Sequence, residues 1–87
     1  MKIKVLGPGC ARCHQLKQTT REVVKELGID TDIEEVKDII KIMEYPILTT
    51  PGLVIDGQLV STGRVPTKAE VTQFIANALT EEDKNKR

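Results

Sequence analysis

The strongest structural signal in the chain is Asp56-Gly57, which separates two short apolar segments. Residues 53–55 read Leu-Val-Ile before this dipeptide, and residues 58–61 read Gln-Leu-Val-Ser after it. Asp-Gly suits a type I′ hairpin turn, because both central residues of that turn need positive φ angles. The sequence therefore predicts two strands that are antiparallel neighbours in a sheet.

Apolar spacing predicts the elements that precede this hairpin. Ile3 and Val5 alternate with lysines as in a strand, which Gly7-Pro8-Gly9 would end. Residues 10–27 predict a long amphipathic helix, and residues 31–36 a second strand. A short helix between Asp38 and Pro46 follows. One face of the long helix would carry Leu16, Thr20, Val23, Val24 and Leu27. The short helix carries Ile39, Ile40 and Met43, and spacing predicts that Met43 is a core residue.

The last predicted helix begins at a capping box, Thr67-Lys68-Ala69-Glu70, and continues with apolar residues at helical spacing, Phe74 among them. The order is β-α-β-α-β-β-α, which predicts an α/β fold: a four-stranded mixed sheet with helices on both faces and its first two strands parallel. A chain of 87 residues has room for one domain, here residues 1–79. Residues 80–87 are expected to form a charged, flexible tail.

Charge and hydropathy exclude several kinds of partner. Lys and Arg together number 13, as do Asp and Glu, and the aromatic residues are Tyr45 and Phe74. Such a chain lacks the net positive charge and the stacking platforms that bind nucleic acid. No apolar run approaches the roughly 20 residues that span a bilayer, and the first residues do not resemble a signal peptide. We therefore expect a cytoplasmic monomer that binds neither nucleic acid nor membrane.

The two cysteines, Cys10 and Cys13, lie where a strand and turn give way to a helix. Side chains three apart on a helix are close enough to form a disulfide. Unpaired N–H groups and the positive end of the helix dipole favour a thiolate there, most strongly at Cys10. Arg12 adds positive charge nearby. We therefore predict that Cys10 is the nucleophile and that Cys13, further into the helix, is the resolving thiol.

Other interpretations of this pair stay open at this point. A Cys-x-x-Cys pair at a strand-to-helix turn can bind a soft metal such as Cu(I) or Zn, and the spacing alone does not distinguish metal binding from redox chemistry. The two residues could also be inert buried thiols. His14 could tune a thiolate or join a metal site, but a solvated surface histidine is the favoured interpretation. We expect Arg64 to be a solvated charge in a loop and not a residue that holds the substrate.

Thr50-Pro51 directly precedes the third predicted strand. Proline cannot donate to a central strand ladder, so it belongs at the start of a strand. A cis bond there would leave the Thr50 backbone pointing outward, where it could pair with an extended substrate segment. Local sequence alone favours an ordinary trans proline, since only about 5–6% of such bonds are cis.

Together, Cys10-x-x-Cys13, Thr50-Pro51, Asp56-Gly57 and Gly63 resemble the thioredoxin superfamily, in particular the small redox-active disulfide proteins of archaea and bacteria. The resemblance covers about residues 2–79. It implies a thioredoxin-like fold, a cis Pro51 packed beside the two sulfurs, and a substrate-docking surface formed by Cys10, Thr50, Pro51 and Gly63. The implied activity is thiol–disulfide exchange without a cofactor or metal, with protein disulfides as substrates and a disulfide reductase as electron donor.

The sequence departs from most thioredoxins at several positions. Gly9 replaces the aromatic residue before the first cysteine, and Ala11-Arg12 replaces Gly-Pro between the two. Lys4 stands where thioredoxins bury an acid, so the proton acceptor for Cys13 is open, with Glu35 or water as candidates. The glycine and acidic pair that holds glutathione in glutaredoxins is absent, which favours protein dithiols over glutathione. A soft-metal carrier of ferredoxin-like fold would have the order β-α-β-β-α-β, which this chain does not follow.

Overall fold

The computed structural model describes residues 1–9, 11–47 and 49–85, with side chains as far as residue 80. The elements follow the predicted order: β1 (Ile3–Leu6), α1 (Ala11–Glu26), β2 (Ile33–Val36), α2 (Ile39–Ile42), β3 (Gly52–Ile55), β4 (Gln58–Thr62) and α3 (Lys68–Asn85). The four strands form one mixed sheet in the order β2-β1-β3-β4, with β1 parallel to β2 and the other neighbours antiparallel. The predicted thioredoxin-like α/β fold is confirmed.

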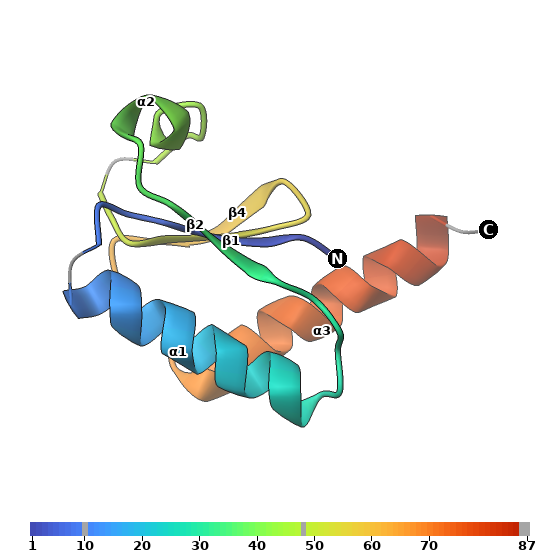
Figure 1. Ribbon diagram of the computed structural model, residues 1–87. Helices are drawn as coiled ribbons and strands as arrows, with labels where there is room; N and C mark the ends of the chain where they lie inside the picture. The colour runs from blue at the N-terminus through green and yellow to red at the C-terminus, as the bar shows by residue number, and fades with distance from the viewer. Residues whose placement is uncertain (10, 48, 86–87) are drawn as a thin grey trace.

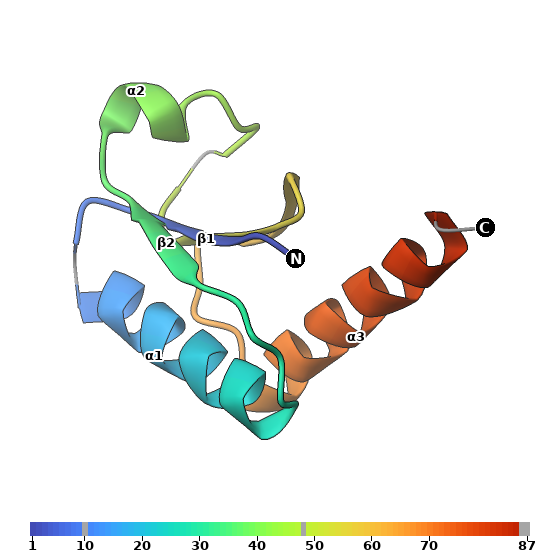
Figure 2. The same cartoon turned by 45° about the vertical axis from the view of Figure 1, so that its right-hand side comes forward.

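The helices cover the two faces of the sheet unequally. Figures 1 and 2 show α1 and α3 together on one face and the short α2 on the other. The strand periodicity explains this layering, because alternate side chains point to opposite faces. The larger core lies under α1 and α3 and contains Ile3, Val5, Leu16, Val23, Val24, Leu53, Ile55, Val71 and Ile75. A smaller core under α2 contains Leu6, Val36, Ile42 and Val54.

Local signals in the sequence account for most element boundaries. Asp56 and Gly57 have φ angles of 50° and 83°, which is the positive-φ pair that the hairpin prediction required. The capping box also forms: the Glu70 N–H donates to Thr67 Oγ1 at 3.2 Å, and the Thr67 N–H donates to Glu70 Oε1 at 3.1 Å. Asp38 caps α2 by accepting from the Ile40 N–H at 2.9 Å.

Two predicted core positions are wrong, and the cause is the same in both cases. Met43 is 73% exposed, because α2 ends at Ile42 and only that residue of the helix reaches the sheet. Leu27 is 43% exposed, because α1 ends one residue earlier. Periodicity predicts the face of a helix on which a residue lies, but it does not predict how far the underlying sheet extends.

Helix α3 continues past the predicted end of the domain. It runs to Asn85, so its backbone extends beyond Leu79 into the segment expected to be a tail. Residues 80–85 contain no glycine or proline that would stop a helix. The flexibility of this segment stays a prediction. Among the described residues, no helix is long and apolar enough to cross a membrane.

Leu16 provides a test of the larger core. It is fully buried between α1 and the sheet, so Leu16→Ala should reduce the free energy of unfolding by about 2–5 kcal/mol. Leu27→Ala, which removes the same atoms from an exposed position, should cost less than about 1 kcal/mol. Urea unfolding of both variants measures the difference, and equal losses would contradict this packing.

Candidate active site at the start of helix α1

The chain between β1 and α1 makes a tight connection built on glycine. The Gly7 N–H donates to the carbonyl oxygen of Val36 at 2.9 Å, which extends the pairing of β1 with β2 by one residue. Gly9 has a φ of 97°, in the region that glycine adopts most readily. Helix α1 then begins at Ala11. This connection brings the first turn of α1 directly beneath the end of the sheet.

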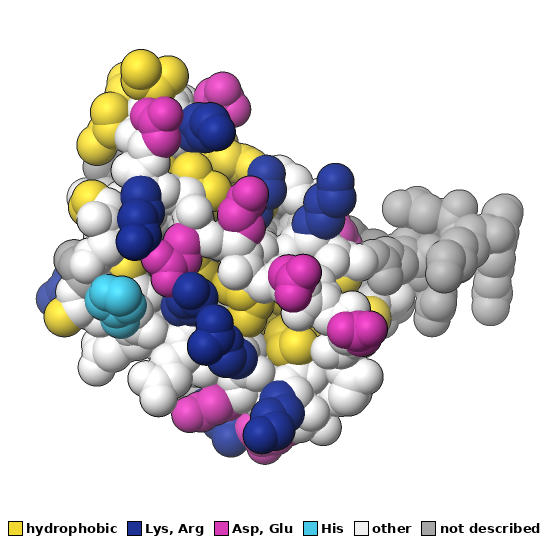
Figure 3. Space-filling model, viewed as in Figure 1, with side chains coloured by type: hydrophobic (Ala, Val, Ile, Leu, Met, Phe, Trp, Pro, Cys, Tyr) yellow, Lys and Arg dark blue, Asp and Glu magenta, His cyan; other side chains and the backbone are white. Residues whose placement is uncertain are grey.

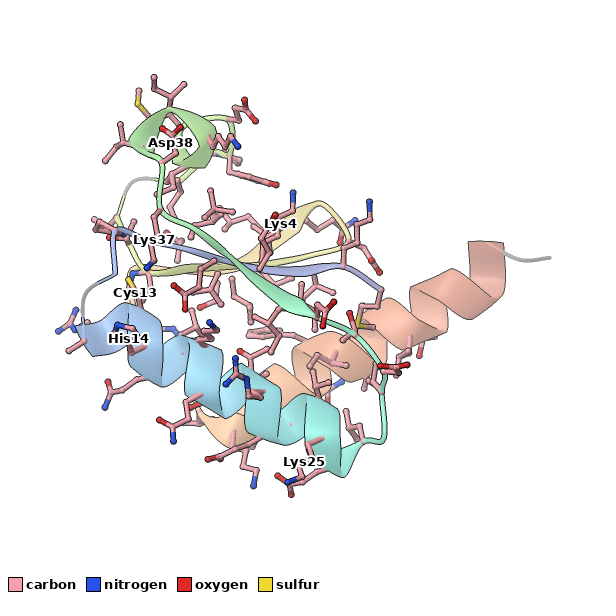
Figure 4. All side chains as sticks on the ribbon, in the orientation of Figure 1. Lys4, Cys13, His14, Lys25, Lys37 and Asp38 are labelled. Atoms are coloured by element: carbon pink, nitrogen blue, oxygen red, sulfur yellow. The ribbon has the colours of Figure 1, made fainter. Side chains whose placement is uncertain are left out.

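Cys13 lies in that first turn and faces the sheet. Figure 4 shows its side chain pointing from α1 towards the strands, and the residue is only 6% exposed. A Cβ placed on Gly7 would overlap the Cys13 Sγ, and it would lie 3.8 Å from the Thr50 Cβ. The Cys13 sulfur therefore occupies the space left by the missing side chain of Gly7, close to Thr50.

Cys10, the predicted nucleophile, lies outside the described residues. In the sequence it immediately precedes the first residue of α1. The first turn of this helix, residues 11–14, contains no acidic side chain. Arg12 and His14 in the same turn are exposed, and Figure 4 shows His14 on the outer side of α1. The charge of Arg12 thus adds to the positive end of the helix dipole.

The loop that contains Thr50 and Pro51 lies at the same end of the sheet. The bond between the two residues is cis, which agrees with the geometry that the resemblance implied, and Pro51 is buried. The Gly63 N–H donates to the Pro51 carbonyl oxygen at 2.9 Å, and Thr62 Oγ1 donates to the Thr49 carbonyl oxygen at 2.9 Å. Gly63 has a φ of 77°, and a Cβ there would overlap Thr49 Oγ1. These hydrogen bonds therefore hold the segment after β4 against the loop before β3.

The structure thus brings Cys13, Thr50, Pro51 and Gly63 together at one end of the sheet. The sequence prediction did not include Gly7, whose missing side chain makes room for the sulfur. Its position between the strand and the cysteine pair offered a signal, since a glycine often marks a close approach of another group.

The carboxylate of Glu35, one candidate proton acceptor for Cys13, forms ion pairs with two lysines. Its Oε1 lies 2.5 Å from the Lys17 Nζ on α1, and its Oε2 lies 3.4 Å from the Lys37 Nζ. The hydrogen bond from Lys17, assisted by Lys37, lowers the pKa of the Glu35 carboxyl below its usual value. A lowered pKa makes a carboxylate a weaker base, which favours water as the acceptor. The spacing of residues along the chain does not predict that these two lysines contact Glu35.

Lys4, at the position where thioredoxins bury an acid, has a different environment. It is only half-buried and faces the α2 side of the sheet, where its Nζ lies 3.7 Å from Glu34 Oε2. A hydrogen bond with Tyr45 and the charge of Glu34 raise the pKa of the Lys4 ammonium group. Lys4 is therefore a cation in this structure and does not replace the missing acid.

Arg64 and Glu70 tie the Gly63 segment to α3. Arg64 Nη1 and Nη2 donate to the two Glu70 carboxylate oxygens at 3.0 and 2.5 Å. These hydrogen bonds, together with the one from the Thr67 backbone, lower the pKa of Glu70 to about 2. Arg64 is thus paired with a neighbouring acid, although it stays largely exposed, as expected for a loop charge.

Metal binding finds no support in the described part of the chain. Across residues 1–9, 11–47 and 49–85, no group of three or more cysteine, histidine or acidic side chains is close enough to hold a metal ion. Four ligands are the rule for structural zinc sites.

Comparison with known proteins identifies the family. A family model described as a thioredoxin domain matches residues 1–76. The chain belongs to the thioredoxin family. A thioredoxin of Methanothermobacter thermautotrophicus is 43% identical over 76 residues, which cover 87% of this chain and 99% of that protein. A thioredoxin of Methanocaldococcus jannaschii is 34% identical over 77 residues, which cover 88% of each chain. A thioredoxin-like redox function is therefore established at the level of the family.

The contact between Gly7 and Cys13 can be tested by a double-mutant cycle. Gly7→Ala should destabilise the reduced protein by about 1–3 kcal/mol, because the new methyl group and the sulfur need the same space. In a Cys13→Ala background the sulfur is absent, so the same substitution should cost clearly less. Chemical denaturation of the four proteins measures the coupling. An equal cost in both backgrounds would contradict the close approach.

The Arg64–Glu70 pair predicts a specific pH dependence. The pKa of Glu70 is about 2 in the folded protein and near 4.5 without its partners, so the pair stabilises the fold above about pH 4.5. That contribution disappears as the pH falls towards 2. The stability difference between wild type and Glu70→Gln should therefore shrink over this interval in thermal unfolding. A difference that is constant from pH 7 to pH 2 would be inconsistent with the pair, and Glu44→Gln serves as the control.

Proposed function

We propose that this protein is a thiol–disulfide oxidoreductase that cycles Cys10 and Cys13 between a dithiol and a disulfide. The observation that carries the proposal is the placement of Cys13: it lies in the first turn of α1, buried against Gly7 and close to Thr50. A resolving thiol needs this kind of site, shielded from solvent but one helical turn from the nucleophile. Membership of the thioredoxin family supports the same chemistry.

The proposed reaction has two exchange steps. The Cys10 thiolate attacks one sulfur of a substrate disulfide, which forms a mixed disulfide and releases the other substrate sulfur as a thiolate. Cys13 then loses its proton to water and attacks the Cys10 sulfur. This step forms the Cys10–Cys13 disulfide and releases the second substrate thiolate. Two electrons have passed to the substrate, and both released thiolates take up protons from water.

Local electrostatics support Cys10 as the attacking group. A thiol at a helix N-terminus lies near unpaired N–H groups and the positive end of the dipole, both of which stabilise a thiolate. The first turn of α1 carries Arg12 and contains no acidic side chain that would oppose this effect. The thiolate form at Cys10 would therefore be available near neutral pH.

The Thr50 loop is the proposed docking surface for the substrate. Thr50 is half-buried next to the Cys13 site, and Pro51 is hydrogen-bonded to Gly63 at 2.9 Å, so the loop is fixed by its neighbours. An extended segment of a protein substrate could pair with the Thr50 backbone as an added strand. We expect protein disulfides as substrates and a disulfide reductase as the electron donor, with the protein acting as a cytoplasmic monomer.

Reduction of insulin disulfides by the dithiol form, followed by turbidity, tests the proposal. Wild type should reduce insulin, and both Cys10→Ser and Cys13→Ser should lower the rate by at least about 100-fold, because each step needs its own sulfur. Cys13→Ser should accumulate a mixed disulfide with insulin, and Cys10→Ser should not.

Two results would count against the proposal. If the mixed disulfide accumulates with Cys10→Ser instead, the roles of the two cysteines are reversed. If wild type exchanges no disulfide but binds Cu(I) or Zn tightly, the redox function is wrong and metal binding replaces it.

A further inference from the structure

A groove between α1 and β2 brings basic side chains together. It has a volume of about 500 Å³, and Glu35 lines it from the strand side. From the helix it is lined by Lys17, Arg21, Lys25 and, at the end nearest the cysteines, His14. Figure 3 shows basic side chains gathered on this face, and Figure 4 shows His14 and Lys25 towards opposite ends of α1. We call this feature the α1 groove.

The ion pairs of Glu35 leave the α1 groove positive. Its two carboxylate oxygens lie 2.5 Å from the Lys17 Nζ and 3.4 Å from the Lys37 Nζ, so two cations share one acid. The other acid among the described lining residues is Glu22. The whole chain has equal numbers of basic and acidic residues, so the excess of cations belongs to this face and not to the average composition.

The positive surface continues from the groove to the cysteine turn through Lys37. A Cβ placed on Gly9 would lie 3.9 Å from the Lys37 Cε, and Gly9 immediately precedes Cys10 in the sequence. The Lys37 side chain is 60% exposed, so its ammonium group stays accessible beside Glu35. Arg12 in the first turn of α1 is also exposed. A negatively charged group that approaches the cysteine turn would therefore meet cations from two elements.

The spacing of the cations along α1 does not serve the helix itself. Lys17, Arg21 and Lys25 follow one another at intervals of four residues, which places them on the same face. Like charges at this spacing destabilise a helix by about 0.2–0.5 kcal/mol per pair. Glu22, three residues before Lys25, can offset one of these charges. Because neutral residues would suit the helix better, the row of cations points to a negatively charged ligand.

We propose that the α1 groove binds an acidic segment of the protein substrate. The inference rests on the proposed function and names the substrate class. With a rise of 1.5 Å per residue, Arg21 and Lys25 lie roughly 12 and 18 Å along the helix from Cys13. An extended segment advances about 3.3 Å per residue, so acids about four to six residues from the reacting cysteine reach them. The preferred substrates are proteins whose cystine is flanked by acidic residues at this distance.

The lining of the groove favours an acidic polypeptide over a nucleic acid. The described residues that line it include no aromatic side chain on which a base could stack. The chain as a whole has no net positive charge to hold a phosphate backbone. The groove also begins at His14, next to Cys13. A segment bound there would lie beside the cysteine pair, as a flanking part of a disulfide substrate must.

A peptide series tests the inference. The probes are disulfide-linked dimers of short peptides, in which a run of glutamates, glutamines or lysines begins about four residues before or after the cysteine. Oxidation of the protein dithiol by each probe is followed by stopped flow in about 20 mM salt. For at least one direction, the glutamate peptide should react at least about five times faster than the glutamine peptide, because opposite charges accelerate association. In about 0.5 M salt the difference should fall below about twofold.

Charge-reversed variants assign this preference to the groove. Arg21→Glu/Lys25→Glu should react faster with the lysine peptide than with the glutamate peptide. Lys2→Glu/Lys41→Glu changes the net charge equally at exposed positions outside the groove, so it should still prefer glutamate. Bis(2-hydroxyethyl) disulfide is uncharged and should react equally with all three proteins. Thermal unfolding checks that the variants are folded. The milder Arg21→Gln/Lys25→Gln, which should lose the preference, replaces the first variant if that one does not fold.

The outcomes separate this inference from the proposed function. If every probe reacts but glutamate and glutamine peptides are equivalent in both directions at low salt, the groove inference is wrong and the redox function stands. The same conclusion follows if Arg21→Glu/Lys25→Glu still prefers glutamate. A single-stranded oligonucleotide that binds more tightly than the reduced glutamate peptide in fluorescence anisotropy, and is released by this variant, would assign the groove to nucleic acid and also overturn the inference. If no disulfide reacts, the proposed function itself fails.

Discussion

The close approach of the Cys13 sulfur to Gly7 is the constraint on which the arrangement of this end of the molecule depends. The sulfur lies where a Gly7 side chain would be, so α1 can begin directly beneath the end of β1. The same contact brings Cys13 near Thr50, which precedes the central strand β3. Gly63 then fixes the Thr50 loop through its hydrogen bond to Pro51. Any larger residue at position 7 would push the helix away from the loop.

The unequal covering of the sheet divides the molecule into a stabilising face and an open face. Helices α1 and α3 bury most of the aliphatic side chains, and their packing accounts for the stability of a chain of this size. The α2 face is closed by four buried residues and a four-residue helix. Such a short helix covers little of the sheet face beneath it. Some of the apolar side chains that it leaves exposed, Ile39 and Met43, line a groove together with Thr49 and Thr50.

Much of the fold could be predicted from local sequence signals. Asp56-Gly57 and the Thr67–Glu70 capping box act within a few residues, so their geometry follows from backbone preference and short-range hydrogen bonds. The exposure of Met43 could not be predicted in this way, because it depends on where the sheet ends beneath α2. Spacing placed it inside the core, although the helix is too short to carry it there.

The candidate site was predictable in part for a similar reason. The resemblance to the thioredoxin superfamily implied that Thr50, Pro51 and Gly63 lie beside the cysteine pair. The sheet explains why, because the end of β1, the start of β3 and the end of β4 meet at one edge. The ion pair between Lys17 and Glu35 joins a helix to a strand, so it depends on the parallel register in which Val5 faces Glu35. No local pattern encodes that register. The sequence alone therefore could not predict that Lys17 lowers the pKa of Glu35 and makes it a weaker base.

The proposed mechanism depends most on the different roles of Cys10, proposed as the attacking group, and Cys13, which is shielded from solvent. The most direct measurement is brief alkylation of the reduced native protein with iodoacetamide at neutral pH, with mass spectrometry to quantify the modification at each cysteine. The account predicts that Cys10 reacts at least about ten times faster than Cys13, because Cys13 is only 6% exposed and lies beneath Gly7. Equal rates, or faster modification of Cys13, would contradict it.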